Sequence, residues 1–259
     1  MSGAALLEIR GLVKSFGGVK AVSDLVMTVQ AGEIHALIGP NGSGKTTLLN
    51  VISGLYRADA GSIRFDGREL RGMPPHAIAI AGVARTFQNI RLFAGLSVRE
   101  NVMIGRHART STGLAGALFA RRATGREERD TRERADELLA FVGLAHSNAA
   151  PARSLPYGDQ RRLEIARALA TEPRLLLLDE PAAGMNPTET DDLIGLVERI
   201  RQRGITLLLI EHDMNLVMTV SDRITALNFG TRIADGTPAE IARHAGVIAA
   251  YLGGSTDAA

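Results

Sequence analysis

One eight-residue stretch, Gly39-Pro-Asn-Gly-Ser-Gly-Lys45-Thr46, carries residue types that bind phosphate groups in a fixed order. It fits the pattern G-x-x-x-x-G-K-[ST], in which each fixed position has a physical purpose. Gly42 and Gly44 let the backbone curve closely enough for its N–H groups to surround a β-phosphate. Lys45 offers a compact positive charge to the β and γ oxygens, and the Thr46 hydroxyl can ligate Mg²⁺. The stretch therefore predicts a nucleoside triphosphate site.

The elements on either side of this stretch are those that such a site needs. The preceding run, Ile34–Ile38, is short, apolar and prone to form a β-strand. A helix beginning near Gly44 would direct the positive end of its dipole at the bound phosphates. The alternative is a chance glycine-rich turn, but such a turn rarely has a strand before it and a helix after it.

A second group of residues predicts the chemistry that would follow binding. Residues 175–178 are four leucines, which indicate a buried strand, and Asp179 and Glu180 follow them directly. The carboxyl end of a strand in an α/β sheet is where ligands bind, so Asp179 can hold Mg²⁺ there. Glu180 can polarise the water that attacks the γ-phosphate. Alone, the two acids would be the solvated end of a strand; beside Lys45 and Thr46 the catalytic interpretation is favoured.

Three weaker features accompany these two motifs. Gln88 ends a candidate strand and could reach Mg²⁺ or the attacking water, and His212 follows the buried strand expected at Thr206–Ile210. A lone histidine is more often structural, but His212 would share a sheet edge with Asp179 and Glu180. Gly158 precedes a polar helix start that resembles a second anion-binding helix end. An ordinary amphipathic helix is the alternative for that segment.

Composition narrows the class of protein. The 259 residues can hold one large domain or two small ones, and the hydrophobic fraction of 45% is ordinary for a globular protein. Cysteine is absent, which excludes disulfides and thiolate metal sites. The formal net charge is only +2, aromatic residues make up 4%, and no basic block stands out, so nucleic-acid binding is disfavoured. We expect neither a signal peptide nor a membrane-spanning segment.

Hydrophobic periodicity indicates an α/β fold with a helical insertion. Strands are expected at residues 6–9 and 25–29, followed by a hairpin at 61–67. Residues 90–170 change to helices and loops, with a surface excursion at 105–125 and a charged helix opened by a capping box at Thr124 and Glu127. That helix would carry the i,i+4 pairs Glu128/Arg132 and Asp130/Arg134 and stop at Gly143.

Alternation of strands and helices then returns in the last third of the chain. Short apolar strands that alternate with helices imply a largely parallel sheet covered on both faces. The elements expected there are strands at 175–178, Thr206–Ile210 and 223–227, and helices at 189–203 and 213–220.

Taken in order, these motifs resemble the ATPase subunits of ATP-binding cassette (ABC) transporters over nearly the whole chain. Gly39–Thr46 resembles the Walker A motif and residues 175–179 resemble Walker B, with Glu180 as the catalytic glutamate. Gln88 matches the glutamine of the Q-loop, and His212 matches the switch histidine. The resemblance also implies a role for Phe16 as the aromatic that stacks on adenine. The residues that it implies for binding ATP and Mg²⁺ are Phe16, Gly39, Pro40, Asn41, Gly42, Ser43, Gly44, Lys45, Thr46 and Thr47, with Thr46, Gln88 and Asp179 toward the metal.

Two further segments match motifs that would face a second subunit. The signature position is occupied by Leu155, Pro156, Tyr157, Gly158 and Asp159. Residues 182–186 resemble the D-loop. Tyr157 and Asp159 depart from the general Leu-Ser-Gly-Gly-Gln signature, and Asn186 replaces the D-loop aspartate. Both departures are typical of the LivG-type branch, whose members energise the import of branched-chain amino acids. Four further segments have sequences similar to that branch, namely residues 85–93, 157–166, 180–187 and 211–214.

The resemblance implies a fold and a set of partners. The fold is an α/β P-loop core at 1–89 and 171–237, with a mixed, largely parallel sheet and an N-terminal antiparallel β part. An α-helical subdomain is inserted at 90–170, and a helical tail follows at 238–259. Two ATPase subunits would enclose two ATP molecules head to tail. The implied partners are a homologous LivF-like ATPase, two transmembrane permeases and, indirectly, a substrate-binding protein. A homodimer or a monomer is the alternative when the chain is purified alone. The chain would be cytoplasmic and peripheral on the inner face of the membrane.

Three alternatives belong to other classes or cargoes. A GTP-binding switch should carry an Asn-Lys-x-Asp motif, and none is present. A DNA-repair-type ABC ATPase would need long coiled-coil insertions, for which the middle segment is too short. An ATPase of the same fold could instead serve lipopolysaccharide export or urea and amide import, because other subunits read the cargo.

Overall fold

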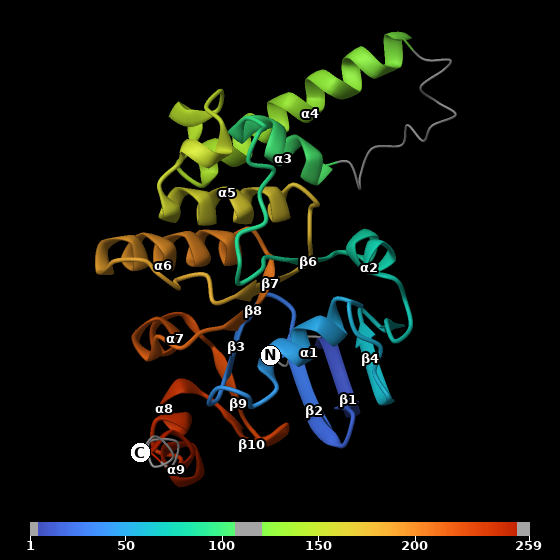
Figure 1. Cartoon of the computed structure of the whole chain (residues 1–259), viewed down its shortest axis with the longest axis vertical. Helices are drawn as coiled ribbons and strands as arrows, with labels where there is room; N and C mark the ends of the chain where they lie inside the picture. Colours follow the sequence, from blue (N-terminus) through green and yellow to red (C-terminus); the bar gives the residue numbers. More distant parts are fainter. Residues whose placement is uncertain (1–4, 107–120, 253–259) are drawn as a thin grey trace.

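The computed structural model describes residues 5–106 and 121–252, which form two β-sheets and the helices packed on them (Figure 1). The first sheet is antiparallel, with the strand order β2-β1-β4-β5. It confirms the antiparallel N-terminal part and the hairpin near residue 65. Its strands are β1 (Ala5–Phe16), β2 (Val19–Gln30), β4 (Ala60–Phe65) and β5 (Arg68–Glu69).

The second sheet has six strands in the order β10-β9-β3-β8-β7-β6. All neighbouring strands pair in parallel except β9 and β10, which are antiparallel, so the sheet is mixed and largely parallel as predicted. Its strands are β3 (Ile34–Ile38), β6 (Val83–Arg85), β7 (Leu175–Asp179), β8 (Thr206–Ile210), β9 (Arg223–Asn228) and β10 (Thr231–Gly236).

Burial of the central strands explains their apolar sequences. Every residue of β3, β7 and β8 is buried, as expected for parallel strands covered on both faces. Successive residues point to opposite faces. Leu176 and Leu178 of β7 therefore join the apolar cluster beneath the helical part, whereas Leu175 and Leu177 join the cluster shared with the first sheet.

Helices cover the second sheet, and those of the middle third lie together at one end of the molecule (Figure 1). α1 packs between the two sheets, whereas α3, α4 and α5 pack against one another above the second sheet. The helices are α1 (Lys45–Ile52), α2 (Pro75–Ala81), α3 (Val98–Arg106), α4 (Arg121–Phe141), α5 (Tyr157–Leu169), α6 (Pro187–Gln202), α7 (Met214–Val220), α8 (Pro238–Ile241) and α9 (Ala245–Leu252).

The parallel register brings the chemically interesting strand ends to one edge. β3, β7 and β8 are neighbours, with Leu37 beside Ile210 and Asp179 beside Ile210. The segments that follow these three strands therefore leave the sheet on the same side, where α/β folds bind ligands. β6 runs parallel to β7 and ends at Arg85, so the segment that carries Gln88 leaves on that side too.

Several predicted boundaries are wrong. β1 and β2 each span 12 residues rather than four or five, because their polar residues face the exposed side of an antiparallel ribbon. α4 begins at Arg121, so Thr124 lies inside the helix and does not cap it. α6 begins at Pro187 rather than at residue 189, since Asn186 caps it and proline suits the first helical position.

The expected surface excursion at 105–125 is also wrong at both ends. Gly105 belongs to α3 and packs so closely on α5 that a Cβ there would lie 2.3 Å from the carbonyl oxygen of Arg167. Residues 121–125 belong to α4, and 107–120 lie outside the described residues. Of the two predicted ion pairs on α4, Glu128 pairs with Arg132, whereas Arg134 pairs with Glu137 at i,i+3.

Candidate nucleotide site

The predicted phosphate loop connects β3 to α1, and two of its glycines leave no room for a side chain. A Cβ on Gly39 would lie 2.2 Å from the carbonyl oxygen of Leu227, and one on Gly44 would lie 2.2 Å from that of Ala21. Both have positive φ, at 151° and 103°. α1 opens at Lys45, directly after Gly44, so its first free N–H groups face the loop.

Lys45 is buried inside this loop and acts there as a hydrogen-bond donor. Its ammonium donates to the carbonyl oxygens of Gly39 at 2.7 Å and Pro40 at 2.9 Å. Burial lowers the pKa of Lys45, whereas the nearby charges of Glu180 and Asp179 oppose that shift. The loop thus holds a cation among oxygen acceptors, a position that suits phosphate oxygens as well.

The other predicted loop residues line the same turn. Ser43 is buried, its backbone N–H donates to the Pro40 carbonyl oxygen at 3.1 Å, and its backbone oxygen accepts from Gly230. Asn41 and Thr46 are exposed and Thr47 is half-buried. The Thr46 hydroxyl therefore stands at the solvent side of the loop, where a bound ion can reach it.

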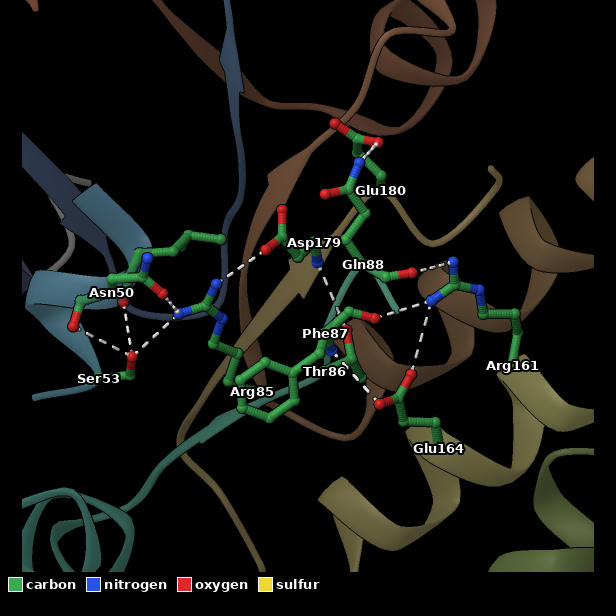
Figure 2. A network of polar contacts seen from close by, with 11 residues as sticks. Asn50, Ser53, Arg85, Thr86, Phe87, Gln88, Arg161, Glu164, Asp179 and Glu180 are labelled. Atoms are coloured by element: carbon green, nitrogen blue, oxygen red, sulfur yellow. Dashed lines mark hydrogen bonds and ion pairs between the residues drawn. The ribbon is translucent and has the colours of Figure 1, made fainter. Parts of the chain in front are cut away.

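Asp179 ends β7 as a buried carboxylate with one oxygen paired and one oxygen without a partner (Figure 2). Its Oδ2 accepts from Arg85 at 2.8 Å, whereas its Oδ1 is buried and has no hydrogen bond. The same guanidinium donates to Asn50 at 2.7 Å and to Ser53 at 3.1 Å, both on or next to α1. An unpaired buried carboxylate oxygen is costly, and a cation is the natural partner for it.

Glu180 contacts Gln88 and His212, two of the residues that the weaker sequence features singled out. Its Oε2 accepts from Nε2 of Gln88 at 2.8 Å, and its Oε1 lies 2.7 Å from Nε2 of His212. Glu180 also has φ = +49°, an uncommon conformation for a residue with a side chain, which turns the chain sharply at the end of β7. The structure thus brings together Gln88, Glu180 and His212, which lie far apart in the sequence.

These residues fit Mg²⁺ bound together with a nucleotide. Oδ1 of Asp179 has no hydrogen-bond partner, and together with the side-chain oxygens of Thr46 and Gln88 it could offer the oxygen ligands that Mg²⁺ prefers. In the described part of the chain, no three His, Asp or Glu side chains are grouped to hold a metal by themselves. Mg²⁺ at nucleotide sites is held by one or two protein side chains and completed by phosphate oxygens and water.

The predicted signature segment lies at the start of α5. Pro156 caps the helix, Leu155 is buried and Tyr157 is 44% exposed. Gly158 packs on α6, since a Cβ there would lie 2.8 Å from Oε1 of Glu189. Asp159 lies 3.8 Å from Arg162. Among the described residues, no hydrogen bond or ion pair joins this segment to residues 39–47.

Asn186 has a structural role at the start of α6, whereas Phe16 lies partly exposed at the end of β1. Asn186 caps α6: its Oδ1 accepts from the Glu189 N–H at 3.0 Å, and Glu189 accepts from the Asn186 N–H in return. Phe16 ends β1 with 45% of its surface exposed and meets Tyr56 edge-on at 5.2 Å between ring centroids. Lys14 lies 5.1 Å from the centre of the Phe16 ring.

The sequence did not predict the residues that support the predicted site residues from behind, which are Arg161, Glu164 and Glu211. Arg161 and Glu164 of α5 contact the backbone around Gln88 (Figure 2). Glu211 accepts from the N–H groups of Ala182 and His212, and burial raises its pKa. A charged residue directly after a buried strand is the signal that could have found Glu211.

The C-terminal helix also reaches the phosphate loop. Tyr251 of α9 accepts a hydrogen bond from the N–H of Gly39 at 2.9 Å, across more than 200 residues of sequence. Tyr251 as a whole is 37% exposed. Nothing in the spacing of the tail residues predicts this contact.

A groove of about 1180 Å³ lies between the first part of the chain and the helical part. α2, β6, α3 and α5 line it, and its surface is mostly apolar. Arg85, which holds Asp179, also borders this groove, although its side chain is almost fully buried. Glu100, Glu127, Arg91 and Arg167 add charges of both signs at the groove.

Comparison with known proteins agrees with this geometry. A family model described as "ABC transporter" matches residues 22–183, well over half of the chain. The chain belongs to the ABC transporter family. A second model, "Branched-chain amino acid ATP-binding cassette transporter", matches residues 231–257, which include β10, α8 and α9.

Curated relatives of this ABC protein cover nearly its whole length. It is 47% identical over 249 residues to the high-affinity branched-chain amino acid transport ATP-binding protein BraF of Pseudomonas aeruginosa, over 96% of this chain and 98% of that protein. The LivG protein of Escherichia coli K12, with the same description, is 45% identical over the same shares. The probable LivG of Archaeoglobus fulgidus is 35% identical, over 96% of this chain and 95% of that protein.

Solved structures show the ABC fold directly. A nucleotide-free ATP-binding cassette from an ABC transporter superposes with a TM-score of 0.84 at 31% identity, over 96% of this chain and 99% of that one. The ADP conformation of an ATP-binding cassette of an ABC transporter gives the same TM-score at 32% identity over the same shares. In the described ranges, no helix is both long and apolar enough to cross a membrane.

Proposed function

We propose that this chain is the ATP-binding and ATP-hydrolysing subunit of an ABC importer for branched-chain amino acids, namely leucine, isoleucine and valine. The observation that carries the ATPase part is the cluster of Gln88, Glu180 and His212, which lies at the sheet edge that also holds the Lys45 loop and Asp179. The cargo rests on the descriptions of the relatives and of the tail model.

ATP binding rests on the loop of residues 39–47. Its backbone N–H groups and the start of α1 would surround the β-phosphate, and Lys45 would exchange the carbonyl oxygens of Gly39 and Pro40 for phosphate oxygens. Phe16 would stack on the adenine. Thr46, Gln88 and Asp179 would hold Mg²⁺, which when bound neutralises charge on the β- and γ-phosphates.

Hydrolysis follows from the position of Glu180. A water bonded to its carboxylate would attack the γ-phosphorus while Glu180 accepts the proton of that water, and ADP leaves as the bond to the β-γ bridging oxygen breaks. His212 holds Oε1 of Glu180 and Gln88 holds Oε2, so the carboxylate has one orientation. His212 would also contact the γ-phosphate once the site closes.

Partners follow from the transporter family. A second, LivF-like ATPase would place its signature segment on the ATP bound here, while Leu155–Asp159 of this chain would serve the partner's ATP. The groove beside Arg85 would receive a segment of a transmembrane permease, because it is the large apolar concavity in the described part of the chain. The chain would then lie on the inner face of the membrane.

Amino acid uptake in a deletion strain tests the cargo. We expect loss of labelled leucine uptake when the gene is deleted, restoration by the wild-type gene and no restoration by Glu180→Gln. Normal leucine uptake together with a defect in lipopolysaccharide export or in growth on urea would contradict the cargo and leave the ATPase proposal standing. The ATPase activity is tested separately, by measuring hydrolysis of ATP and GTP by the purified chain with its partner ATPase. We expect ATP hydrolysis to exceed GTP hydrolysis.

A further inference from the structure

Three charged side chains on one face of α5 lie beneath the segment that carries Gln88. Arg161, Glu164 and Arg167 are spaced three residues apart, so they share a helix face. Arg161 is 3% exposed and Glu164 is 1% exposed. Buried charges are costly unless they are paired and hydrogen-bonded, so this face needs partners.

Those partners are the backbone groups of residues 87–91 (Figure 2). Arg161 donates to the carbonyl oxygen of Phe87 at 2.8 Å and to that of Gln88 at 2.5 Å. Glu164 accepts from the N–H groups of Phe87 and Arg91, each at 3.4 Å. α5 therefore holds the backbone on both sides of Gln88: Arg161 donates to the carbonyl oxygens of Phe87 and Gln88, and Glu164 accepts from the N–H groups of Phe87 and Arg91.

Besides its ion pair with Glu164 at 3.6 Å, the guanidinium of Arg161 contacts the exposed start of α5. It donates to the hydroxyl oxygen of Tyr157 at 2.8 Å and lies 5.3 Å from the centre of that ring. At the other end, the Gln88 side chain donates to Glu180, which contacts His212. A connected path thus runs from Tyr157 to His212: Arg161 bonds to Tyr157 and to the backbone oxygen of Gln88, and the side chain of Gln88 bonds to Glu180.

We propose that Arg161 is a positioning residue that transmits a movement of Tyr157 to Gln88 and, through Gln88, to Glu180. This inference rests on the proposed function, in which Tyr157 faces the nucleotide of the partner ATPase and Glu180 acts on the nucleotide of this chain. One guanidinium would then link the two nucleotide sites. A planar guanidinium can hold three acceptors in a fixed fork, which the single ammonium of lysine cannot reproduce.

Two charge-conserving variants on neighbouring positions test the role of Arg161. Arg161→Lys keeps the charge and loses the fork. Arg162→Lys makes the same change at a residue that pairs with Asp192 at 2.7 Å and forms no hydrogen bond or ion pair with residues 87–91, all of which lie in the described part of the chain. In the full chain with its partner ATPase, Arg161→Lys should lower kcat for ATP hydrolysis by about 10-fold or more. KM for ATP should stay within about twofold, because the Lys45 loop is untouched. Arg162→Lys should match the wild type in both.

A double-variant comparison distinguishes positioning from a loss of packing. If Arg161 acts through Gln88, then Arg161→Lys should lower kcat no further in a Gln88→Ala background. The proposal would be overturned if the losses of kcat caused by Arg161→Lys and Gln88→Ala added up in the double variant. It would also be overturned if Arg161→Lys and Arg162→Lys had the same kcat.

A milder variant covers the case in which Arg161→Lys does not fold. Tyr157→Phe removes only the hydroxyl that accepts from Arg161, on a side chain that is 44% exposed. It should lower kcat without raising KM, and an unchanged kcat would overturn the proposal. Wild-type protein that binds its partner but hydrolyses no ATP would instead refute the proposed function. Normal wild-type hydrolysis together with unaffected variants refutes the role of Arg161 alone.

Discussion

Nε2 of His212 lies 2.7 Å from Oε1 of Glu180, although 32 positions separate the two residues in the sequence. β7 and β8 run side by side in parallel, so the residues that follow them meet at one edge. Gln88 holds the other oxygen of the same carboxylate at 2.8 Å. Both oxygens of Glu180 therefore have a defined partner within the chain, and these two contacts fix the orientation of the proposed base.

Glu180→Gln keeps the shape of that side chain and removes its capacity to accept a proton. We expect ATP binding to persist and ATP turnover to fall by roughly 10² or more. Because ATP would then remain bound, the variant should accumulate as a closed dimer with the partner ATPase. Light scattering in ATP measures the dimer, and an unchanged molecular mass would contradict the proposed head-to-tail arrangement.

Lys45→Ala removes the cation that now bonds to the carbonyl oxygens of Gly39 and Pro40. Nucleotide binding or turnover should be lost, because among the described residues Lys45 is the lysine that donates into the loop, where the β- and γ-phosphates would lie. Lys20→Ala is the control, since Lys20 is exposed at the start of β2. Titration with a fluorescent ATP analogue measures both variants. Equal affinity for Lys45→Ala and the control would refute the phosphate site.

The sequence predicted the strands of the second sheet well because their physics is local. Buried parallel strands are continuous apolar runs, and glycines with positive φ mark the turn between β3 and α1. The family and the fold predicted from those motifs are confirmed by the comparisons. Boundaries failed where polar residues continue an exposed strand, as in β1 and β2, or where an arginine-rich segment extends a helix beyond its expected start, as in α4.

What the sequence did not predict is the set of contacts between distant elements. Arg85 and Asp179 form a contact although they are 94 residues apart. From the sequence alone, Arg161 would be assigned to a solvated helix face, because nothing in the sequence shows its backbone acceptors. Periodicity describes which face of one element is polar and says nothing about which element covers that face. The same limit hides the bond between Tyr251 and Gly39.

Arg85→Met should destabilise the protein because it leaves the Asp179 carboxylate buried without its ion-pair partner. The two side chains are 5% and 2% exposed, and breaking a pair so well buried costs about 3 kcal/mol. Arg174→Met is the matched control, since its pair with Asp66 is exposed on both sides and should contribute little. Urea denaturation measures both. A loss no greater than that of the control would mean that another cation compensates for Asp179.

Phe16→Ala should weaken nucleotide affinity by about 1 to 2 kcal/mol, the contribution of one base–aromatic stack. The loss should be similar for ATP and GTP, because a stacked ring contacts the face of a base and reads no edge. Tyr56→Ala tests the alternative that the aromatic pair acts as a unit, since the two rings meet at 5.2 Å. Calorimetric titration gives both affinities. An unaltered affinity in Phe16→Ala would assign the base contact to another residue.

Stability should depend on pH through Glu211, and the direction follows from its burial. Burial raises the pKa of Glu211 although the N–H groups of Ala182, His212 and Asp213 lower it in part. The folded state therefore binds the proton more tightly than the unfolded state. Its contribution to stability is present below the unfolded pKa of about 4.3 and is lost as pH rises through the folded pKa.

Glu211→Gln carries a side chain that resembles the protonated carboxyl and does not titrate. Relative to the wild type, this variant should gain stability as the pH rises from about 4 toward neutrality. Glu100→Gln should show the opposite sign, because hydrogen bonds from Ser97 lower the pKa of Glu100, so the wild type is the more stable protein above the unfolded pKa of Glu100 and loses that advantage in acid. Urea unfolding of the three proteins between pH 4 and pH 8 measures both slopes. Parallel curves for Glu211→Gln and the wild type would show that Glu211 ionises as easily in the folded chain as in the unfolded one.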